Sequence, residues 1–571
     1  MVTSRKLLPT TGLVLGLLFL AGCRGLVSEG GSGPGTGFQL AVTSAGPGSG
    51  TITSAPAGIN CPGTCSANFP SGTQVTLTAT PATSFEFSGW SGACTGPGTC
   101  AVSVNSATTA TANFSGTLQS INHVIFMLQE NRGFTHYFGA LREYWAANGF
   151  PDHPDFKGLP QFNNPSEPAP TNLGCDPNLS PVDNCKIGPN SPTVASFHMI
   201  SQCIENPSPS WNESHVDWNV SDPVSATPTM DGWVRTAAGD ARSGTPVFSD
   251  ISGTRAMGYY DGTDLPYYYF MASSFATSDM WFSPAMTRTQ PNRLYLMAAT
   301  SAGRAYPLPS TMTQLPNKTI FESLQDKNVS WRVYVTDDEN IPLANGTEAG
   351  MFTFANSHLD NFAPASQFFT DLTTGNLPSV VEIDPGFAKA TDEHPGTDPS
   401  APAGRVQTGA AYVSTLINAL MKSPYWKDSV FVLTWDEGGG FYDYVPPQPM
   451  PSPDGIKPSM SIDLLPGDIC TDPTQTGPNC DFVYTGYRVP MMVISPYSKK
   501  NYLSHATADY TAILKLIEKR FNLSPLTARD AAQIDMDTEF FDFSAPWLTP
   551  PAASSIPVQP DTMPCYMDHL P

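Results

Sequence analysis

The sequence predicts an α/β protein in which a mostly parallel β-sheet is flanked by helices and preceded by a small all-β domain stapled by disulfides. Two observations support this prediction. Past Leu118, four continuous apolar runs alternate with helical patterns, at residues 123–128, 330–335, 429–435 and 490–495. Before Leu118, a segment rich in Thr, Ser and Gly alternates apolar and polar residues. Strands buried on both faces have continuous apolar runs, whereas half-buried antiparallel strands alternate.

The composition is that of a folded, loop-rich exported protein. The 571 residues allow one large and one small domain, and a hydrophobic content of 40 % supplies a core. The chain contains 47 Gly and 56 Pro, while only 14 % of its residues are charged. A net charge of −22 argues against nucleic acid as a partner, because phosphates need a basic surface. An anionic substrate must therefore be captured by local positive charge, such as a metal ion.

The first 23 residues indicate export. Arg5 and Lys6 precede the apolar run "LVLGLLFLAG", and Cys23 follows it. A basic stretch, a short apolar stretch and small residues describe a secretory signal. The letters "LAGC" resemble a bacterial lipobox, which implies cleavage before Cys23 and a lipid on its thiol. The expected location is then the bacterial cell envelope, as a lipoprotein of the outer membrane or cell surface, or the periplasm. The alternative is an ordinary cleaved signal that leaves Cys23 free.

Residues 24–37 form a predicted Gly/Ser linker, and residues 38–115 a small β domain. Residues 73–80 and 100–105 alternate as half-buried strands do. The segment resembles a bacterial surface repeat module of β type. It contains no cluster of acids or histidines, so we expect a spacer or adhesive domain.

Without Cys23, ten cysteines remain, an even number that suggests disulfides in an exported chain. Cys175/Cys185 and Cys470/Cys480 are candidate local pairs, but spacing leaves the connectivity open.

Residues 118–545 form the predicted catalytic domain, and residues 546–571 a Pro-rich tail. Residues 409–423 and 509–521 carry apolar side chains at helical spacing. Strands that alternate with helices imply a mostly parallel sheet, and ligands of such sheets bind beyond the carboxyl ends of the strands.

Two strand exits carry clustered polar residues. Glu130, Asn131 and Arg132 follow the first apolar run, and Asp436 and Glu437 follow the third, before three glycines. An oxygen-rich pocket of this kind repels itself unless a cation sits in it. Each residue taken alone is more often a turn former or a helix cap, so the cluster is what predicts a metal site.

Thr289 lies in "TRTQPNRLYLMAAT", residues 287–300. The Pro-Asn-Arg turn that follows can place Thr289 at a helix start, where free N–H groups favour anions. A threonine nucleophile needs activation by a base or a metal. The alternative is a threonine that caps the helix.

The motif "INHVIFMLQENRGFTHYFG" resembles the opening motif of a bacterial phosphoesterase family that contains phospholipases C and respiratory-burst-inhibiting acid phosphatases. Further pieces match in order over roughly residues 118–545, among them "SHVDWN", "TQPNRL", "DEHPG", "VFVLTWDEGGGFYDYV" and "SHATADYTAILKLIEKRF". The resemblance implies an alkaline-phosphatase-like fold, related to that of sulfatases.

Carried over by position, the resemblance implies one divalent metal ion held by five residues: Glu130, Asn131, Thr289, Asp436 and Glu437. Thr289 would be the nucleophile of a phosphoenzyme mechanism, and Asn131 would ligate the metal or donate to the phosphate. Oxygen ligands suit Ca²⁺, Mg²⁺ or Mn²⁺, and Zn²⁺ is also compatible.

Three histidines fall in matching motifs, namely His215, His394 and His505. An imidazolium can hold phosphate oxygens or protonate the departing alcohol, whereas an isolated histidine is more often structural.

Arg293 is expected to bind substrate or, alternatively, to pair with a carboxylate near the end of the sheet. Gly438 and Tyr444 depart from the family pattern, in which relatives carry a histidine or asparagine and "YDHV", respectively.

We therefore expect a metal-dependent phosphoester hydrolase, acid-phosphatase-like on phosphomonoesters. The alternative substrate is a phospholipid, as for a phospholipase C. The short segment after the last motif favours monoesters, because larger relatives carry a long lipid-binding extension, whereas a lipid anchor at Cys23 favours phospholipid. An alternative from another class is a surface adhesin with a degenerate enzyme domain.

Overall fold

The computed structural model describes residues 37–179, 185–244, 247–309, 314–338, 342–396, 404–472 and 480–566. The predicted signal, its Cys23 and the linker up to residue 36 lie outside the described residues. Within the described ranges, none of the helices combines the length and the apolar character that a bilayer span requires.

Two four-stranded sheets make up the N-terminal domain, with the orders β4-β1-β8-β6 and β3-β2-β5-β7. Their strands are β1 (Phe38–Ala45), β2 (Gly50–Ala55), β3 (Asn60–Cys61), β4 (Ser66–Phe69), β5 (Thr73–Pro81), β6 (Phe85–Gly92), β7 (Cys100–Val104) and β8 (Thr108–Gly116). Both sheets contribute to one core, for example Leu40 of β1 and Val75 of β5. The strands predicted at residues 73–80 and 100–105 are confirmed as β5 and β7, and their pairing is antiparallel. Disulfides Cys61–Cys65 and Cys94–Cys100 staple the domain, as expected of so small a core.

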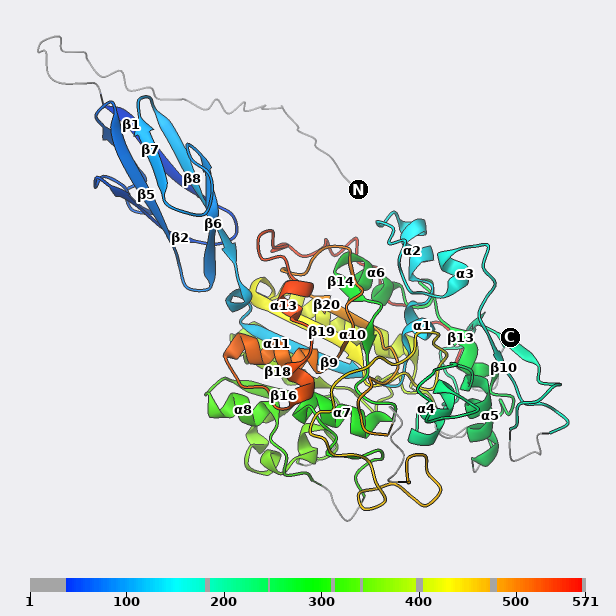
Figure 1. Ribbon diagram of the computed structural model, residues 1–571. Helices are drawn as coiled ribbons and strands as arrows, with labels where there is room; N and C mark the ends of the chain where they lie inside the picture. Colours follow the sequence, from blue (N-terminus) through cyan, green and yellow to red (C-terminus); the bar gives the residue numbers. More distant parts are fainter. Residues whose placement is uncertain are drawn as a thin grey trace, which may run out of the picture.

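A short connection leads from the β domain into the large domain. The backbone N–H of Gly116 donates to the Phe543 carbonyl at 3.0 Å, and the Ser120 hydroxyl donates to the Ser84 carbonyl at 2.8 Å. The β domain projects away from the large domain (Figure 1).

The large domain is built on an eight-stranded sheet with the order β17-β16-β18-β9-β19-β20-β14-β21. Its strands are β9 (His123–Gln129), β14 (Ala276–Ser278), β16 (Trp331–Val335), β17 (Phe362–Pro364), β18 (Val380–Asp384), β19 (Ser429–Trp435), β20 (Met491–Ile494) and β21 (Tyr502–Ser504). All neighbouring strands run parallel except β20, which is antiparallel to β19 and β14. The mostly parallel sheet is therefore confirmed.

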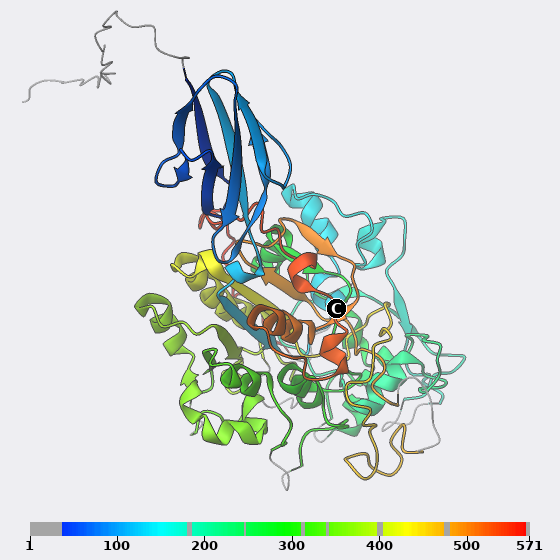
Figure 2. The same ribbon diagram turned by 60° about the vertical axis from the view of Figure 1, so that its left-hand side comes forward.

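The four apolar runs become β9, β16, β19 and β20, and the two helical patterns become α10 (Val406–Lys422) and α11 (Ala512–Phe521). Helix α10 buries Val413, Leu416 and Leu420 completely, as their spacing predicts. Helices flank the sheet (Figures 1 and 2), and α10 packs against α6 and α9.

The other helices are α1 (Phe134–Phe138), α2 (Leu141–Asn148), α3 (Pro160–Asn163), α4 (Trp211–Trp218), α5 (Trp233–Ser243), α6 (Pro266–Ser274), α7 (Thr289–Ala298), α8 (Ile320–Asp326), α9 (Ser366–Thr374), α12 (Ala528–Ala531) and α13 (Met536–Glu539). Short strands outside the main sheet are β10 (Thr171–Leu173), β11 (Thr193–Ala195), β12 (Phe197–His198), β13 (Gly258–Tyr259), β15 (Trp281–Phe282) and β22 (Ala508–Asp509).

Three further disulfides lie in the large domain. Cys175–Cys185 and Cys470–Cys480 confirm the expected local pairs. Cys203–Cys565 joins residues 362 positions apart and ties the C-terminal segment back to the domain.

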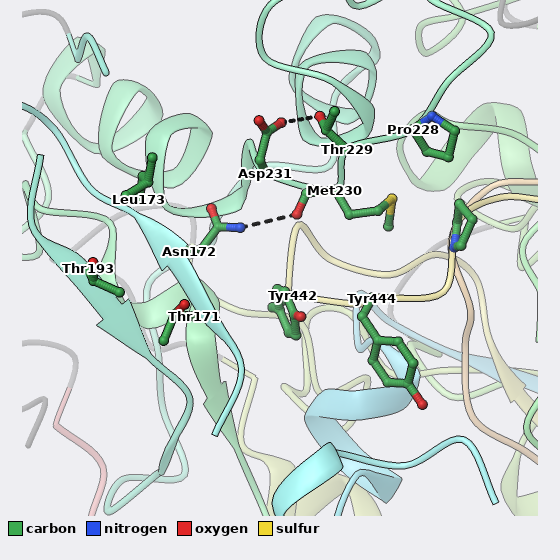
Figure 3. A pocket seen from close by; sticks show the side chains of 11 residues that line it. Thr171, Asn172, Leu173, Thr193, Pro228, Thr229, Met230, Asp231, Tyr442 and Tyr444 are labelled. Atoms are coloured by element: carbon green, nitrogen blue, oxygen red, sulfur yellow. Dashed lines mark hydrogen bonds between the residues drawn. The ribbon is translucent and has the colours of Figure 1, made fainter. Parts of the chain in front are cut away.

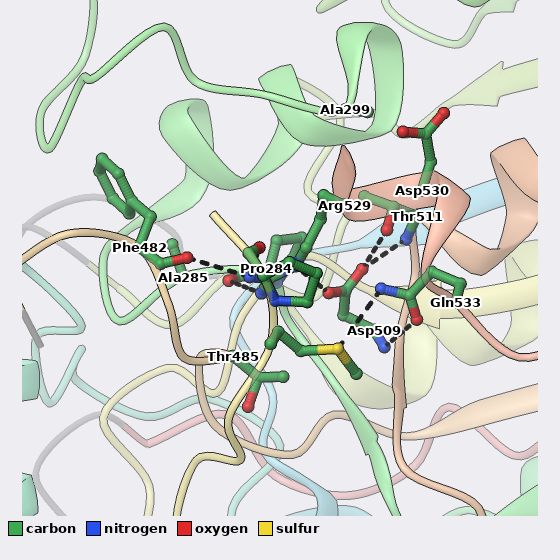
Figure 4. A network of polar contacts seen from close by, with 12 residues as sticks. Pro284, Ala285, Ala299, Phe482, Thr485, Asp509, Thr511, Arg529, Asp530 and Gln533 are labelled. Carbon is green, nitrogen blue, oxygen red and sulfur yellow. Dashed lines mark hydrogen bonds and ion pairs between the residues drawn. The ribbon is translucent and has the colours of Figure 1, made fainter. Parts of the chain in front are cut away.

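Arg529 is a fully buried cation that joins several segments (Figure 4). Its Nε donates to Asp509 Oδ2 at 2.6 Å, and its Nη atoms donate to the carbonyls of Pro284 at 2.6 Å and Phe482 at 3.1 Å. Asp509 also accepts from the Thr511 hydroxyl at 2.5 Å. Because both charges are buried and every group is paired, removing one partner leaves the other charge uncompensated.

Arg529→Ala is therefore expected to lower the free energy of unfolding by about 3–5 kcal/mol. Lys318→Ala is the matched control, because the Lys318–Asp326 pair is exposed, and it should cost less than about 1 kcal/mol. Urea unfolding followed by tryptophan fluorescence measures both. Equal midpoints for the two variants would contradict the structural role given to Arg529.

Candidate active site

The site lies at the carboxyl edge of the sheet, where β9 and β19 end side by side. Gln129 of β9 pairs with Trp435 of β19, so Glu130 and Asp436 are the next residues of two adjacent parallel strands. The N–H of Asp436 donates to the Gln129 carbonyl at 3.0 Å, which continues the pairing past the strand ends. The sheet register thus brings together two acids that are 306 positions apart in the sequence.

Thr289 is the first residue of α7, as its motif predicts. Its Oγ1 lies 3.1 Å from Glu130 Oε2 and 3.2 Å from Asn131 Oδ1. A hydroxyl has one proton to donate, yet here it faces two acceptor oxygens. The structure therefore brings the predicted nucleophile to two of its predicted partners, in a group of oxygens that is short of protons.

A chain of hydrogen bonds fixes the orientation of Asn131. The carbonyl of Pro395 accepts from His394 Nδ1, so His394 Nε2 is left as an acceptor. Asn131 Nδ2 donates to that Nε2 at 2.9 Å, which turns Asn131 Oδ1 toward Thr289. The backbone of Asn131 has φ +55°, a left-handed conformation that asparagine tolerates well, and its N–H donates to Asp436 Oδ1 at 2.9 Å. Oδ1 is therefore available as a metal ligand.

Burial lowers the pKa of His394 to about 4, because desolvation disfavours the imidazolium. His394 is accordingly neutral above this pH, which agrees with its role as an acceptor for Asn131.

Arg293 lies beneath the site and is only 2 % exposed. Its guanidinium is 2.5 Å from Glu130 Oε1, 3.1 Å from Asp436 Oδ2 and 3.3 Å from Glu348 Oε1. Nη2 also donates to the Leu128 carbonyl at 3.1 Å. A cation committed to three carboxylates corresponds to the structural alternative for Arg293, so the geometry speaks against its substrate-binding assignment. Arg132 is similarly committed, since its Nε donates to the Glu393 carbonyl at 2.8 Å.

A second layer of acids surrounds Arg293. Glu348, Glu382 and Asp384 are each less than 5 % exposed, and each has a buried carboxylate oxygen without a hydrogen-bond partner. Desolvation raises the pKa of Glu382 and of Asp384 well above the ordinary value, and the nearby Glu348 adds to this. Sequence reasoning missed these acids, because Glu382 and Asp384 interrupt the apolar run of β18.

Glu437 follows Asp436 and is 1 % exposed. Its Oε2 accepts from the N–H of Gly439 at 2.5 Å, while its Oε1 is buried without a hydrogen-bond partner. Gly439 has φ +71°, and a Cβ there would lie 2.2 Å from the Asn131 carbonyl oxygen. The glycines after the two acids therefore permit the close approach of backbone that their motif predicts.

The donor set fits a divalent cation. Glu130 Oε2, Asn131 Oδ1 and Thr289 Oγ1 converge within hydrogen-bonding distance, and Glu437 contributes an orphaned oxygen. Desolvation raises the pKa of Glu130 and of Glu437, so in the absence of a cation each carboxylate favours a proton. Asp436 is less available, because Asn131 and Arg293 occupy one oxygen each.

A different group of three metal-type ligands was not predicted. His198, Asp261 and Asp264 have ligand atoms within 4.8 Å of one another, with His198 Nε2 2.7 Å from Asp264 Oδ2. This group shares no residue with the predicted site.

A cavity of about 230 Å³ opens beside Thr289. Asn131 and His394 line it, together with residues that sequence reasoning did not select: Asn206, Ser208, Pro209, Ser210, Asp240, Gly244, Phe248 and Arg288. Arg288 is exposed and directly precedes Thr289, so it is the cavity's cation in place of Arg293. Arg288 stands beside Thr289 inside the motif of residues 287–300, whereas no motif marks Asp240, which only the tertiary structure brings to this cavity.

The other two predicted histidines are not among the residues that line this cavity. His215 is fully buried in α4, where its Nδ1 is 2.6 Å from the Trp211 carbonyl and its ring packs on Trp211. His505 follows β21 and pairs with Asp279 at 2.9 Å. Strand β21 is three strands from β19 in the sheet, which puts the two strands roughly 14 Å apart.

The two departures from the family pattern have local explanations. A Cβ at Gly438 would lie 3.1 Å from Tyr487 Cβ, so Tyr487 occupies space that a side chain there would need. The Arg488 guanidinium lies over the Tyr444 ring, with its central carbon 5.4 Å from the ring centroid. Tyr442 and Tyr444 line a separate cavity of about 470 Å³, with Thr229 and Asp231 on its other side (Figure 3).

Comparison with known proteins supports the motif-based expectation. Residues 121–524 match the model of the phosphoesterase family, and residues 40–117 match that of the divergent InlB B-repeat domain. Phospholipase C B of Mycobacterium tuberculosis (strain CDC 1551 / Oshkosh) is 30 % identical over 488 residues, which cover 79 % of this chain and 84 % of that protein. Non-specific phospholipase C1 of Arabidopsis thaliana is 30 % identical over 436 residues, covering 72 % of this chain and 69 % of that protein.

Arg293→Met should destabilise the metal-free protein by about 3–5 kcal/mol, because it leaves several buried carboxylates without a cation. The loss should be larger at pH 8 than at pH 5, since carboxyls with raised pKa values are protonated at the lower pH and then need no partner. Arg288→Met is the control and should leave stability within about 0.5 kcal/mol, as expected of an exposed side chain.

Chemical unfolding at the two pH values measures both variants. Native stability of Arg293→Met together with a raised KM would restore Arg293 to substrate binding.

Proposed function

Because this chain belongs to the phosphoesterase family of phosphoester-bond hydrolases, we propose that it acts through Thr289 as a nucleophile beside a bound divalent ion. The observation that carries the proposal is the position of Thr289 Oγ1, 3.1 Å from Glu130 Oε2 and 3.2 Å from Asn131 Oδ1 at the edge of the sheet. Nucleophile, acid and amide come from two distant segments; Thr289 and Asn131 line the 230 Å³ cavity, and Glu130 contacts Thr289.

Glu130, Asn131, Thr289 and Glu437 would hold the ion, with Asp436 beside them. When bound, the ion supplies positive charge that lowers the pKa of a hydroxyl and polarises a phosphoryl oxygen. All-oxygen ligands suit Mg²⁺, Mn²⁺ or Ca²⁺, and Zn²⁺ remains compatible.

The chain's own residues bind and orient the phosphoryl group. The Arg288 guanidinium lines the cavity and supplies a cation to non-bridging oxygens. Helix α7 spans ten residues, and its first N–H groups have no intrahelical partner, so its N-terminus favours an anion. His394 is neutral and accepts from Asn131, which holds the amide oxygen toward Thr289.

In the first step, Thr289 Oγ1 attacks phosphorus while its proton moves along the hydrogen bond to Glu130 Oε2. The alcohol leaves, and water then hydrolyses the phosphothreonine.

For the substrate, we favour a phospholipid over a phosphomonoester. Each relative described above is a phospholipase C, and a lipid anchor at Cys23 would hold the enzyme at a membrane of the cell envelope. The acid-phosphatase activity expected from the sequence is the second candidate. The adhesin alternative has less support, because capable side chains stand at all five predicted metal positions and the family match spans the large domain. The repeat-like β domain then serves as a spacer.

Thr289→Ala is expected to reduce kcat/KM on phosphatidylcholine by at least about 1,000-fold, since alanine has no hydroxyl to attack phosphorus. Thr289→Ser keeps a hydroxyl and should retain measurable turnover. Release of phosphocholine measures the rates, and acid quenching tests for a phosphothreonine in the wild type. A Thr289→Ala rate above a few per cent of wild type would remove Thr289 from this role. The wild-type rates on phosphatidylcholine and p-nitrophenyl phosphate decide between the two substrate classes.

Glu437→Gln is expected to lower the metal content of the purified protein, because the amide removes a buried negative charge without changing size. In the wild type, metal affinity should fall as the pH is lowered, since the raised pKa of Glu437 lets protons compete with the ion. Elemental analysis after dialysis at several pH values measures both effects. Full metal occupancy in Glu437→Gln would exclude Glu437 as a ligand.

A further inference from the structure

The proposed reaction needs a group that protonates the departing alcohol, and the three histidines considered for this role are poorly placed. His394 accepts from Asn131 through Nε2 and donates to the Pro395 carbonyl through Nδ1, so both of its ring nitrogens are already engaged. His505 follows β21, pairs with Asp279 and does not line the cavity. His215 is fully buried against Trp211.

Asp240 is a carboxyl group in the wall of the same 230 Å³ cavity as Thr289. It comes from α5, whereas Thr289 comes from α7, so two different elements deliver an acid and a nucleophile to one space. A ligand in this cavity of about 230 Å³ can therefore contact both side chains. The Asp240 side chain is 32 % exposed, so a ligand can reach it, and it lies 3.9 Å from the buried Arg255.

The charges around Asp240 leave it able to keep a proton. Desolvation raises its pKa, while Arg255, Arg288 and a hydrogen bond from Ser208 act in the opposite direction. Arg255 is its nearest cation, at 3.9 Å, and that guanidinium is committed elsewhere. It donates to the Asn206 carbonyl at 2.9 Å and the Ala237 carbonyl at 2.8 Å, and it pairs with Asp250 at 3.3 Å. Glu213 of α4 adds negative charge nearby.

We propose that Asp240 is the general acid that protonates the leaving alcohol, and the general base of the second step. In the first step, Thr289 Oγ1 forms a bond to phosphorus, and the bond from phosphorus to the alcohol oxygen breaks. The electron pair of that bond takes the proton of the Asp240 carboxyl, and the neutral alcohol departs. In the second step, the Asp240 carboxylate takes a proton from water as the water oxygen bonds to phosphorus. The Thr289–phosphorus bond breaks, Thr289 Oγ1 takes back from Glu130 the proton that it lost in the first step, and Asp240 is again protonated.

This inference rests on the proposed function, and leaving-group dependence tests it separately. Asp240→Asn should lose about 100- to 10,000-fold in kcat on an alkyl phosphodiester such as phosphatidylcholine, whose alkoxide needs a proton. On p-nitrophenyl phosphorylcholine the loss should stay below about tenfold, because p-nitrophenolate leaves without protonation. In the wild type, the rate on the alkyl substrate should fall as pH rises through the pKa of Asp240, and this limb should be absent in Asp240→Asn.

Glu213→Gln is the matched control, because Glu213 also has a pKa raised by burial but does not line the cavity. It should keep the wild-type ratio of the two rates. A series of aryl phosphorylcholines extends the test without relying on one variant, since the wild-type rate should depend weakly on leaving-group acidity. A steep dependence in the wild type, or equal losses on both substrates in Asp240→Asn, would overturn the role of Asp240. Loss of the proposed function itself would appear differently, as wild-type protein inactive on every phosphoester.

Discussion

The structure depends on the desolvation of carboxylates at the edge of the main sheet. Glu130, Asp436 and Glu437 are each at most 1 % exposed, and unpaired charges at such depth are costly. Arg293 compensates part of this negative charge from beneath, with contacts to Glu130, Asp436 and Glu348. The remainder must be balanced by protons or by a bound cation, and this requirement is the one that the proposed metal ion would meet.

The same constraint explains how Thr289, the proposed nucleophile, is oriented. Arg293 occupies one oxygen of Glu130, so the other oxygen faces Thr289. The amide of Asn131 is turned by His394, which in turn is held by the Pro395 carbonyl. Once its other hydrogen bonds and ion pairs are formed, each of these polar groups can point in only one direction. Rigid second-layer contacts of this kind hold reacting atoms in place without relying on mobile loops.

The cavity beside Thr289 is lined both by groups that attract an anion and by a carboxyl group that can hold a proton. Arg288 and the N-terminus of α7 favour an anion, whereas Asp240 is a carboxyl whose pKa is raised by burial. A phosphoester requires both kinds of group. Its non-bridging oxygens are negative and need a cation, and its leaving oxygen gains negative charge and needs a proton as the bond breaks. In the proposed reaction, Arg288 would stabilise charge and Asp240 would transfer the proton, both from the wall of this one cavity. The overall net charge of −22 makes such local cations necessary for an anionic substrate.

The sequence alone determined the fold class, the residues at the two strand exits and the helix start at Thr289. These features depend on local patterns, namely continuous apolar runs, glycines that follow acids and a Pro-Asn-Arg turn. Strand β18 escaped prediction because Glu382 and Asp384 break its apolar pattern, and their burial makes sense only beside Arg293. Only the tertiary structure decided that Arg293 pairs with carboxylates, that His505 does not line the cavity and that Asp240 shares it with Thr289. These outcomes depend on which distant segments pack together, and such packing produces no periodic pattern in the sequence of either segment.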